Sequence, residues 1–277
     1  MIFRSLNHLK NYLLILLLLL FFSVYFLLNA EDDKFMQLTD TDWVLDWEED
    51  FDSPFLDTAV WSKIPRGVAL WKNTMSSDSR CFDFREGCIV LKGIVNESFD
   101  NDTSGYLTGG IYTKFKKALQ PGRIVIRAKF NSARGAWPAL WLVPYKADKP
   151  WLRDGEIDIM EHFHHKPFVL QTIHSHYTRD VDSEYPKNKM KVHVDFKQFN
   201  EYGVDIFEDS VVFHVNGMKT LCYPKLSDYP DDRQFPFYHD WTLLMDMQLG
   251  GGNVGGINDS ELPVEMEIDW VRHFVRQ

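Results

Sequence analysis

The sequence predicts an all-β protein built as an antiparallel β-sandwich. Two observations lead to this prediction: runs of alternating apolar and polar residues recur along the chain, and helical periodicity is scarce after residue 40. A third is that clusters of glycine, proline, asparagine and serine separate the alternating runs. Many short strands divided by such turns are typical of sandwiches and barrels.

Individual runs support each expected strand. Residues 123–130 and 241–249 carry apolar side chains at every second position, as strands with one face in a core do. Residues 211–215 lead into Asn216-Gly217, which is the strongest short signal for a β-hairpin. The expected turns lie at residues 101–105, 120–122 and 250–252.

Length and composition narrow the classes of function. The 277 residues fit one large or two small domains, and no linker or change in composition divides them, so we expect a single domain over residues 31–277. The net charge is −10 and no block of lysine or arginine stands out, which argues against a nucleic-acid partner. Aromatic residues make up 15% of the chain and can form flat platforms for sugar rings, so a carbohydrate is the better candidate ligand.

The N-terminal segment has the pattern of a secretory signal. Arg4 and Lys10 precede an apolar run over residues 12–28, and Asn29-Ala30 ends the segment with a small residue before three acids. We expect residues 1–30 to be a signal peptide, and the protein to be secreted, periplasmic or displayed at the cell surface. The alternative is that residues 12–28 stay uncleaved as a membrane anchor.

Three cysteines do not form a disulfide framework, because their number is odd. Cys81 and Cys88 could bridge across a hairpin, or both could be buried thiols, and the sequence leaves these two alternatives open. Since no Cys-x-x-Cys pair is present, the cysteines do not indicate a metal site.

The acidic segment Gly155–His162 is the sharpest chemical feature. Strand alternation places Glu156 and Asp158 on one face, but it sends Glu161 to the opposite face. One extra residue in a β-bulge would return Glu161 to the face of the other two acids. The sequence therefore predicts a bulged strand with three carboxylates in one row.

Three carboxylates in a row repel one another, which raises the pKa of at least one, as a general acid near neutral pH requires. The alternatives are a solvated strand edge and a calcium site made of oxygen ligands. The apolar residues Ile157, Ile159 and Met160 between the acids argue against an exposed edge. A straight strand does not wrap a cation as a loop does, so we favour a catalytic interpretation.

Aromatic and polar residues surround the acids in the sequence. Trp137 and Trp141 share one face of a predicted strand and could stack sugar rings or fill the core. His174 and His176 belong to an alternating polar row over residues 172–178, which suits a wet cleft; a zinc site built on them is the weaker alternative. Gln248 lies on the polar side of residues 241–249 and is a further candidate substrate contact.

The chain resembles glycoside hydrolase family 16. The resemblance rests on a bulged Glu-x-Asp-x-x-Glu pattern within residues 155–161 and on Trp-Pro-Ala-x-Trp at residues 137–141. It extends over residues 106–124 and 268–272, and thus over nearly the whole predicted mature chain. The bulged pattern is similar to the laminarinase-like branch. The resemblance implies a β-jelly roll of the concanavalin A-like kind.

This resemblance also implies a retaining double displacement by an endo-acting β-glycanase, of the type that cleaves β-1,3- or mixed-linkage β-glucan. Glu156 would be the nucleophile, Glu161 the general acid and base, and Asp158 would hold and polarise Glu156. Neither a cofactor nor an obligate protein partner is implied, and we expect a monomer. Members of the family often bind one structural calcium ion, here near Asp269.

Two alternatives for the function remain. Residues 61–67, which include the expected substrate contact Arg66, and residues 262–267 are similar to family members from gut-type bacteria. Those act on β-glucans or on galactosyl bonds of poly-lactosamine and mucin chains, so an endo-β-galactosidase is one alternative. The other is a non-catalytic carbohydrate-binding jelly roll, since a fold does not by itself determine a function.

Overall fold

The computed structural model describes residues 42–99, 102–146, 153–229, 232–252 and 254–277. The predicted signal segment, residues 1–30, lies outside them. Residues 45–276 form one compact unit. In the part of the chain that the structure describes, no helix is long and apolar enough to span a membrane.

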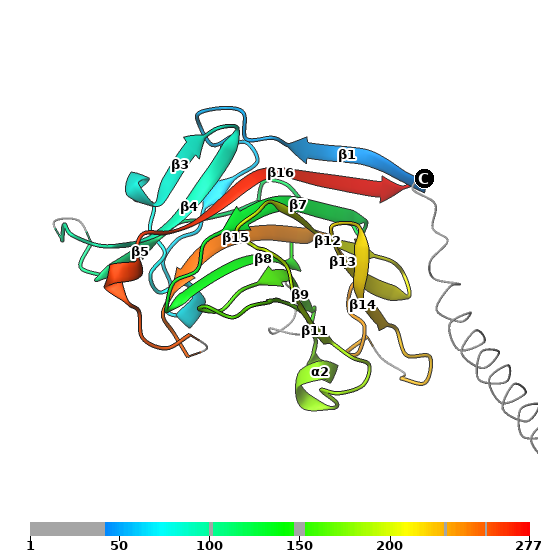
Figure 1. The fold of residues 1–277 in the computed structure, drawn as a ribbon. Helices are drawn as coiled ribbons and strands as arrows, with labels where there is room; N and C mark the ends of the chain where they lie inside the picture. The colour runs from blue at the N-terminus through cyan, green and yellow to red at the C-terminus, as the bar shows by residue number, and fades with distance from the viewer. Residues whose placement is uncertain (1–41, 100–101, 147–152, 230–231, 253) are drawn as a thin grey trace, which may run out of the picture. The chain divides into compact units, whose positions relative to one another are not determined.

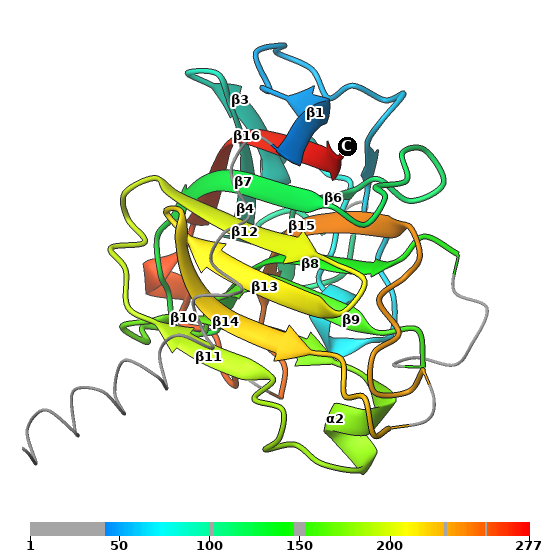
Figure 2. The same ribbon diagram turned by 90° about the vertical axis from the view of Figure 1, so that its right-hand side faces the viewer.

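Two antiparallel sheets make up this unit, which confirms the predicted all-β sandwich (Figures 1 and 2). Within the described residues, the first sheet has nine strands. Seven follow one another in the order β14 (Met218–Pro224), β13 (Ser210–Val215), β12 (Asn200–Ile206), β7 (Arg123–Phe130), β16 (Val264–Arg276), β4 (Cys88–Val95) and β3 (Phe82–Arg85). The other two are β1 (Trp43–Glu49), which pairs with β16, and β5 (Tyr106–Thr108), which pairs with β4.

The second sheet has seven strands within the same described ranges. Their order is β11 (Lys189–Val192), β10 (Val169–His174), β9 (Glu156–Glu161), β8 (Ala136–Pro144), β15 (Trp241–Leu249), β6 (Gly110–Tyr112) and β2 (Ser62–Lys63). Short helical segments lie between the strands: α2 (His176–Asp180), η3 (Leu70–Lys72), η4 (Ser79–Cys81) and η5 (Asp259–Glu261).

The hydrophobic core fills the space between the two sheets. Ile126 and Phe213 of the nine-stranded sheet and Leu140, Ile157 and Met247 of the seven-stranded sheet are all fully buried in one cluster. Burying one such side chain contributes about 1.5–3 kcal/mol. The face of the seven-stranded sheet that points away from this core carries polar side chains together with apolar ones such as Trp141 and Leu244.

The expected strands at residues 123–130, 211–215 and 241–249 correspond to β7, β13 and β15. The hairpin between β13 and β14 is also confirmed, with Asn216 at φ 51° and Gly217 at φ 75°, the positive values that a two-residue hairpin turn requires. β15 differs from the simple alternation, because all of its residues are buried. It lies between β8 and β6, and its polar side is covered by other side chains.

Two further expectations are resolved by the structure. Cys81 and Cys88 form no disulfide, so the alternative of a Cys81–Cys88 bridge is wrong. The predicted polar row over residues 172–178 is correct only as far as His174, where β10 ends. Ser175 then caps helix α2 through a reciprocal capping box with Thr178, which turns the chain out of the strand.

Candidate active site

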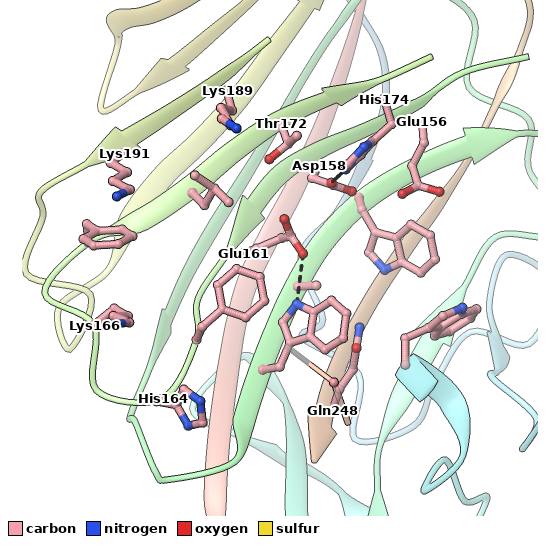
Figure 3. A pocket seen from close by; sticks show the side chains of 18 of the residues that line it. Glu156, Asp158, Glu161, His164, Lys166, Thr172, His174, Lys189, Lys191 and Gln248 are labelled. Atoms are coloured by element: carbon pink, nitrogen blue, oxygen red, sulfur yellow. Dashed lines mark hydrogen bonds and ion pairs between the residues drawn. The ribbon is translucent and has the colours of Figure 1, made fainter. Parts of the chain in front are cut away.

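A cleft of about 790 Å³ lies on the side of the seven-stranded sheet that faces away from the core. Its walls and floor come from β8, β9, β10, β11 and β15, with additions from the loop after β9 and from η3 (Figure 3). Glu156, Asp158 and Glu161 all line it. The sequence therefore predicted correctly that the three acids share one face.

The predicted β-bulge in β9 is confirmed by the strand register. Next to β10, Asp158 pairs with Thr172 and Glu161 pairs with Leu170, so two residues of β9 lie opposite one residue of β10. That residue is the fully buried Gln171, whose Nε2 donates a hydrogen bond of 3.1 Å to the Ile159 carbonyl within the bulge. The bulge thus has a dedicated buried partner, which fixes the direction of Glu161.

Asp158 and Glu161 are each held by an identified neighbour. The Nε2 of His174 lies 2.9 Å from Oδ2 of Asp158, and Nε1 of Trp137 donates to Oε1 of Glu161 over 3.0 Å. Ligand atoms of Glu156, Asp158 and His174 lie within 4.8 Å of one another. Figure 3 shows His174 between Asp158 and Glu156, and Glu161 above the indole to which it is bonded.

Burial and charge separate the protonation states of these groups. Burial, and then the negative charge of Asp158, raise the pKa of Glu161 well above its usual value, although the Trp137 hydrogen bond and His174 oppose the change. Burial lowers the pKa of His174, but the charge of Asp158 and its hydrogen bond outweigh that effect and raise it to about 9. The raised pKa of Glu161 favours the protonated form that can donate a proton, and a pKa of about 9 makes His174 a cation at neutral pH.

Asp246 of β15 lies beneath the cleft and is bonded to two of the side chains that line it. It is fully buried and accepts hydrogen bonds from Nε1 of Trp141 at 2.8 Å and from Nε2 of Gln248 at 2.6 Å. Burial raises its pKa to about 7, with the two hydrogen bonds opposing. The carboxyl orients both side chains toward the cleft. Trp141 is only 8% exposed and packs edge-on against Trp71, so it fills the interior as well as lining the cleft.

The other expected substrate contacts divide into two groups. Trp137, Trp141, His174 and Gln248 line the cleft, whereas Arg66 and His176 do not. Arg66 forms a bidentate ion pair with Asp102 through bonds of 2.6 and 2.7 Å. His176 lies in α2 with its Nε2 3.6 Å from Asp180.

The described side chains give little support for a bound metal ion. Among the described residues, Glu156, Asp158 and His174 are the one group with three candidate ligands close together. A cation there would have to displace the proton that His174 holds against Asp158. The carboxylate of Asp269 forms an ion pair with Arg127, which does not fit the expected calcium ion at that position.

Several cleft residues were not anticipated from the sequence. They are the aromatic residues Trp71, Phe163 and Phe168, and the basic residues His164, Lys166, Lys189 and Lys191. The alternation Lys-Met-Lys-Val over residues 189–192 indicates a strand with both lysines of β11 on one face, although a strand of four residues is short. The loop residues carry no periodic signal.

Comparisons with known proteins agree with this geometry. A family model described as the XgeA-like, catalytic GH16 domain matches residues 123–209. A keratan-sulfate endo-1,4-beta-galactosidase of Sphingobacterium multivorum is 28% identical over 235 residues, which cover 84% of this chain and 55% of the relative. A beta-glucanase of Rhodothermus marinus is 28% identical over 245 residues, covering 83% of this chain and 84% of the relative. The chain thus spans about half of the first relative and most of the second.

Solved structures have the same fold. The laminarinase from Rhodothermus marinus matches with a TM-score of 0.76 and 23% identity, over 85% of this chain and 98% of that chain. A second structure matches with a TM-score of 0.72 and 27% identity. It is connected with the endo-acting O-glycanases that prominent members of the human gut microbiota express to initiate mucin breakdown. That match covers 84% of this chain and all of the other.

Proposed function

We propose that this chain is a glycoside hydrolase of family 16, an endo-acting, retaining enzyme that cleaves internal bonds of a β-linked glycan. The observation that carries this proposal is the bulged strand β9, which brings Glu156, Asp158 and Glu161 into one cleft, where burial raises the pKa of Glu161.

The first half of the reaction uses the two glutamates in different protonation states. Glu161 donates its proton to the glycosidic oxygen as the bond from that oxygen to the anomeric carbon breaks. The Glu156 carboxylate attacks the same carbon from the opposite face and forms a covalent glycosyl ester, while the leaving alcohol departs. Asp158, paired with His174, orients Glu156.

The second half returns the enzyme to its starting state. Glu161, now a carboxylate, takes a proton from a water molecule whose oxygen attacks the anomeric carbon. The bond from that carbon to Glu156 breaks, and the sugar is released with its original anomeric configuration. The steps need no cofactor. We propose no calcium ion at Asp269, because its carboxylate is paired with Arg127.

For the substrate we propose a β-1,3- or mixed-linkage β-glucan. The β-glucanase relative supports this choice, since this chain covers most of its length. The aromatic side chains of Trp71, Trp137 and Phe163 along the cleft offer flat faces for pyranose rings.

An endo-β-galactosidase acting on poly-lactosamine or mucin chains is the second candidate. The similarity to the keratan-sulfate endo-1,4-beta-galactosidase over 84% of this chain supports it, as does the 27% identity to the O-glycanase structure. A non-catalytic lectin-like role is the least favoured alternative, because the acids that catalysis needs are all present in the cleft.

The sequence supports a location outside the cytoplasm. Residues 1–30 would direct the protein out of the cytoplasm, and residues 12–28 would anchor it to the membrane if that segment were retained. Residues 31–277 would act as one catalytic domain, monomeric and without a protein partner.

Product analysis tests the proposal. The purified chain is incubated in parallel with laminarin, mixed-linkage β-glucan, agarose-type galactan, keratan sulfate and mucin O-glycans, with Glu156→Gln as the control. We expect oligosaccharides from at least one substrate and none from the variant. Binding of a polymer without release of any product would instead support the lectin-like alternative.

A further inference from the structure

One end of the cleft is basic, although the whole chain carries a net charge of −10. Lys166, Lys189 and Lys191 line this end, together with His164 (Figure 3). The picture shows the lysines on one side of Glu161 and Gln248 on the other. The double displacement assigns no part to these lysines.

The local sequence explains why two of the lysines point into the cleft. β11 reads Lys-Met-Lys-Val, and its apolar residues Met190 and Val192 pack against the hydrophobic core. Alternation therefore sends Lys189 and Lys191 to the cleft side. Lys166 comes from the loop between β9 and β10, and its carbonyl accepts a 2.8 Å hydrogen bond from the buried His162, which ties this loop to the sheet.

Nearby carboxylates do not neutralise these charges. In the described ranges of the chain, no acidic side chain forms an ion pair with Lys166, Lys189 or Lys191. Lys191 does lie 4.9 Å from the centre of the Phe168 ring, a cation–π contact that keeps its charge. Glu161 is on β9, two strands away from β11, which is roughly 10 Å at the usual spacing of strands. That separation is about one Debye length at 0.1 M salt, so the catalytic acids compensate the lysines only weakly.

We propose that Lys166, Lys189 and Lys191 form a subsite for an anionic substituent, a sulfate ester or a carboxylate, on the glycan that occupies the cleft. The inference rests on the proposed function, because it assumes that the same cleft holds the substrate. A sugar ring at this end would lie beside Phe168 while its anionic group meets the ammonium groups. The subsite lies two strands from the scissile bond, so it selects substrates and takes no part in the chemistry.

Binding to an inactive variant tests the subsite without requiring turnover. Glu156→Gln serves as the background, and Lys189→Gln/Lys191→Gln removes two of the charges. Lys114→Gln/Lys197→Gln is the matched control, because it removes two exposed lysines that do not line the cleft. The probes are keratan sulfate oligosaccharides before and after chemical desulfation, and laminarin oligosaccharides with and without oxidation of C6 to a carboxylate.

With both lysines present, we expect at least one anionic probe to bind about 5- to 10-fold more tightly than its neutral counterpart at low salt. This ratio should fall close to 1 in Lys189→Gln/Lys191→Gln, stay unchanged in the control, and decrease as salt is added. The pair that shows the preference identifies the group as a sulfate ester or as a carboxylate.

Equal binding of charged and neutral probes, or a preference that survives loss of both lysines, would overturn the subsite. The absence of any binding would overturn it as well. Hydrolysis of a neutral substrate by the unaltered chain is measured separately. If the chain hydrolyses that substrate but the anionic probes show no preference, the subsite has failed and the proposed function has not.

Discussion

Two buried carboxyl groups of the seven-stranded sheet differ in their bonding partners from the carboxyl groups on the nine-stranded sheet. On the nine-stranded sheet, the guanidinium of Arg85 lies 2.6 Å from Glu265 and 3.0 Å from Glu267, and Lys92 lies 3.0 Å from Asp83. On the seven-stranded sheet, Glu161 is bonded to an indole and Asp246 to an indole and an amide, neither of which carries a charge.

The pKa values follow from this difference. A hydrogen bond from Lys92 lowers the pKa of Asp83, and pairing with Glu265 raises the pKa of Arg85, so both groups stay charged. Burial among neutral donors raises the pKa values of Glu161 and Asp246 instead. A carboxyl group in this protein thus acquires a raised pKa where the fold removes water and supplies only neutral hydrogen-bond donors.

Replacement of the proposed nucleophile should give the largest effect. We expect Glu156→Ala to lower kcat by about 10⁴-fold or more, as loss of a covalent nucleophile does in other enzymes. Azide should restore product formation with inverted anomeric configuration, detected by NMR. The control is Glu267→Gln on the other sheet, which should leave kcat within about 3-fold. An equal loss in both variants, or no rescue by azide, would contradict the assignment.

Glu161→Gln should be the next largest change. With an unactivated glycoside, kcat should fall by about 10²- to 10⁴-fold because the proton donor is lost, whereas an aryl glycoside with a good leaving group should react almost normally. The folded-state pKa of Glu161 is raised, so ionisation of this group costs stability as pH rises. The variant should therefore melt at a higher temperature than the wild type at pH 8. Glu265→Gln, which breaks a pair with Arg85, should melt slightly lower.

Activity should also report the protonation of Glu161. We expect kcat/KM to fall on the alkaline side as Glu161 loses its proton. Trp137→Phe keeps an aromatic ring but removes the donor that stabilises the Glu161 carboxylate, so the alkaline limb should move to higher pH. The loss at the optimum should be less than about tenfold. An alkaline limb that stays in place would mean that another group controls it.

A smaller effect is expected on stability through His174. Its folded-state pKa of about 9 exceeds the usual 6.5, so its pairing with Asp158 stabilises the fold fully below pH 6.5 and is lost as pH rises through 9. His174→Gln should reduce the free energy of unfolding by on the order of 1 kcal/mol at pH 6, because the His174 side chain is 35% exposed and solvent screens the pair in part. The difference from the wild type should vanish near pH 10. An unchanged gap across this range in denaturant melts would contradict the pairing.

The smallest effect should come from the exposed ion pairs of the nine-stranded sheet. Arg85→Gln removes contacts with Glu265 and Glu267, and it should cost only about 0.2–1 kcal/mol of unfolding free energy. Added salt should shrink this difference further, and kcat should not change. A large loss of activity would show that the two sheets are coupled, which would weaken the contrast drawn between them.

Local pattern was sufficient to predict much of this protein. The alternation in β7, the Asn216-Gly217 turn and the acidic segment of β9 each carry their information within fewer than ten neighbouring residues. Even the bulge could be inferred, because three acids could share one face of a strand only if one residue were added. These features depend on short-range geometry, which the order of residues largely determines by itself.

The remaining features depend on contacts between distant segments. Asp246 has a pKa of about 7 because it is fully buried in β15 between β8 and β6, and the sequence gives no sign of that burial. Arg66 was expected at the substrate, but its partner Asp102 lies 36 residues away and holds it outside the cleft. The basic end of the cleft exists because β11 joins the edge of the sheet beside β10. The sequence determined which strands and acids exist, while tertiary packing decided which of them lose water, gain a partner and acquire a shifted pKa.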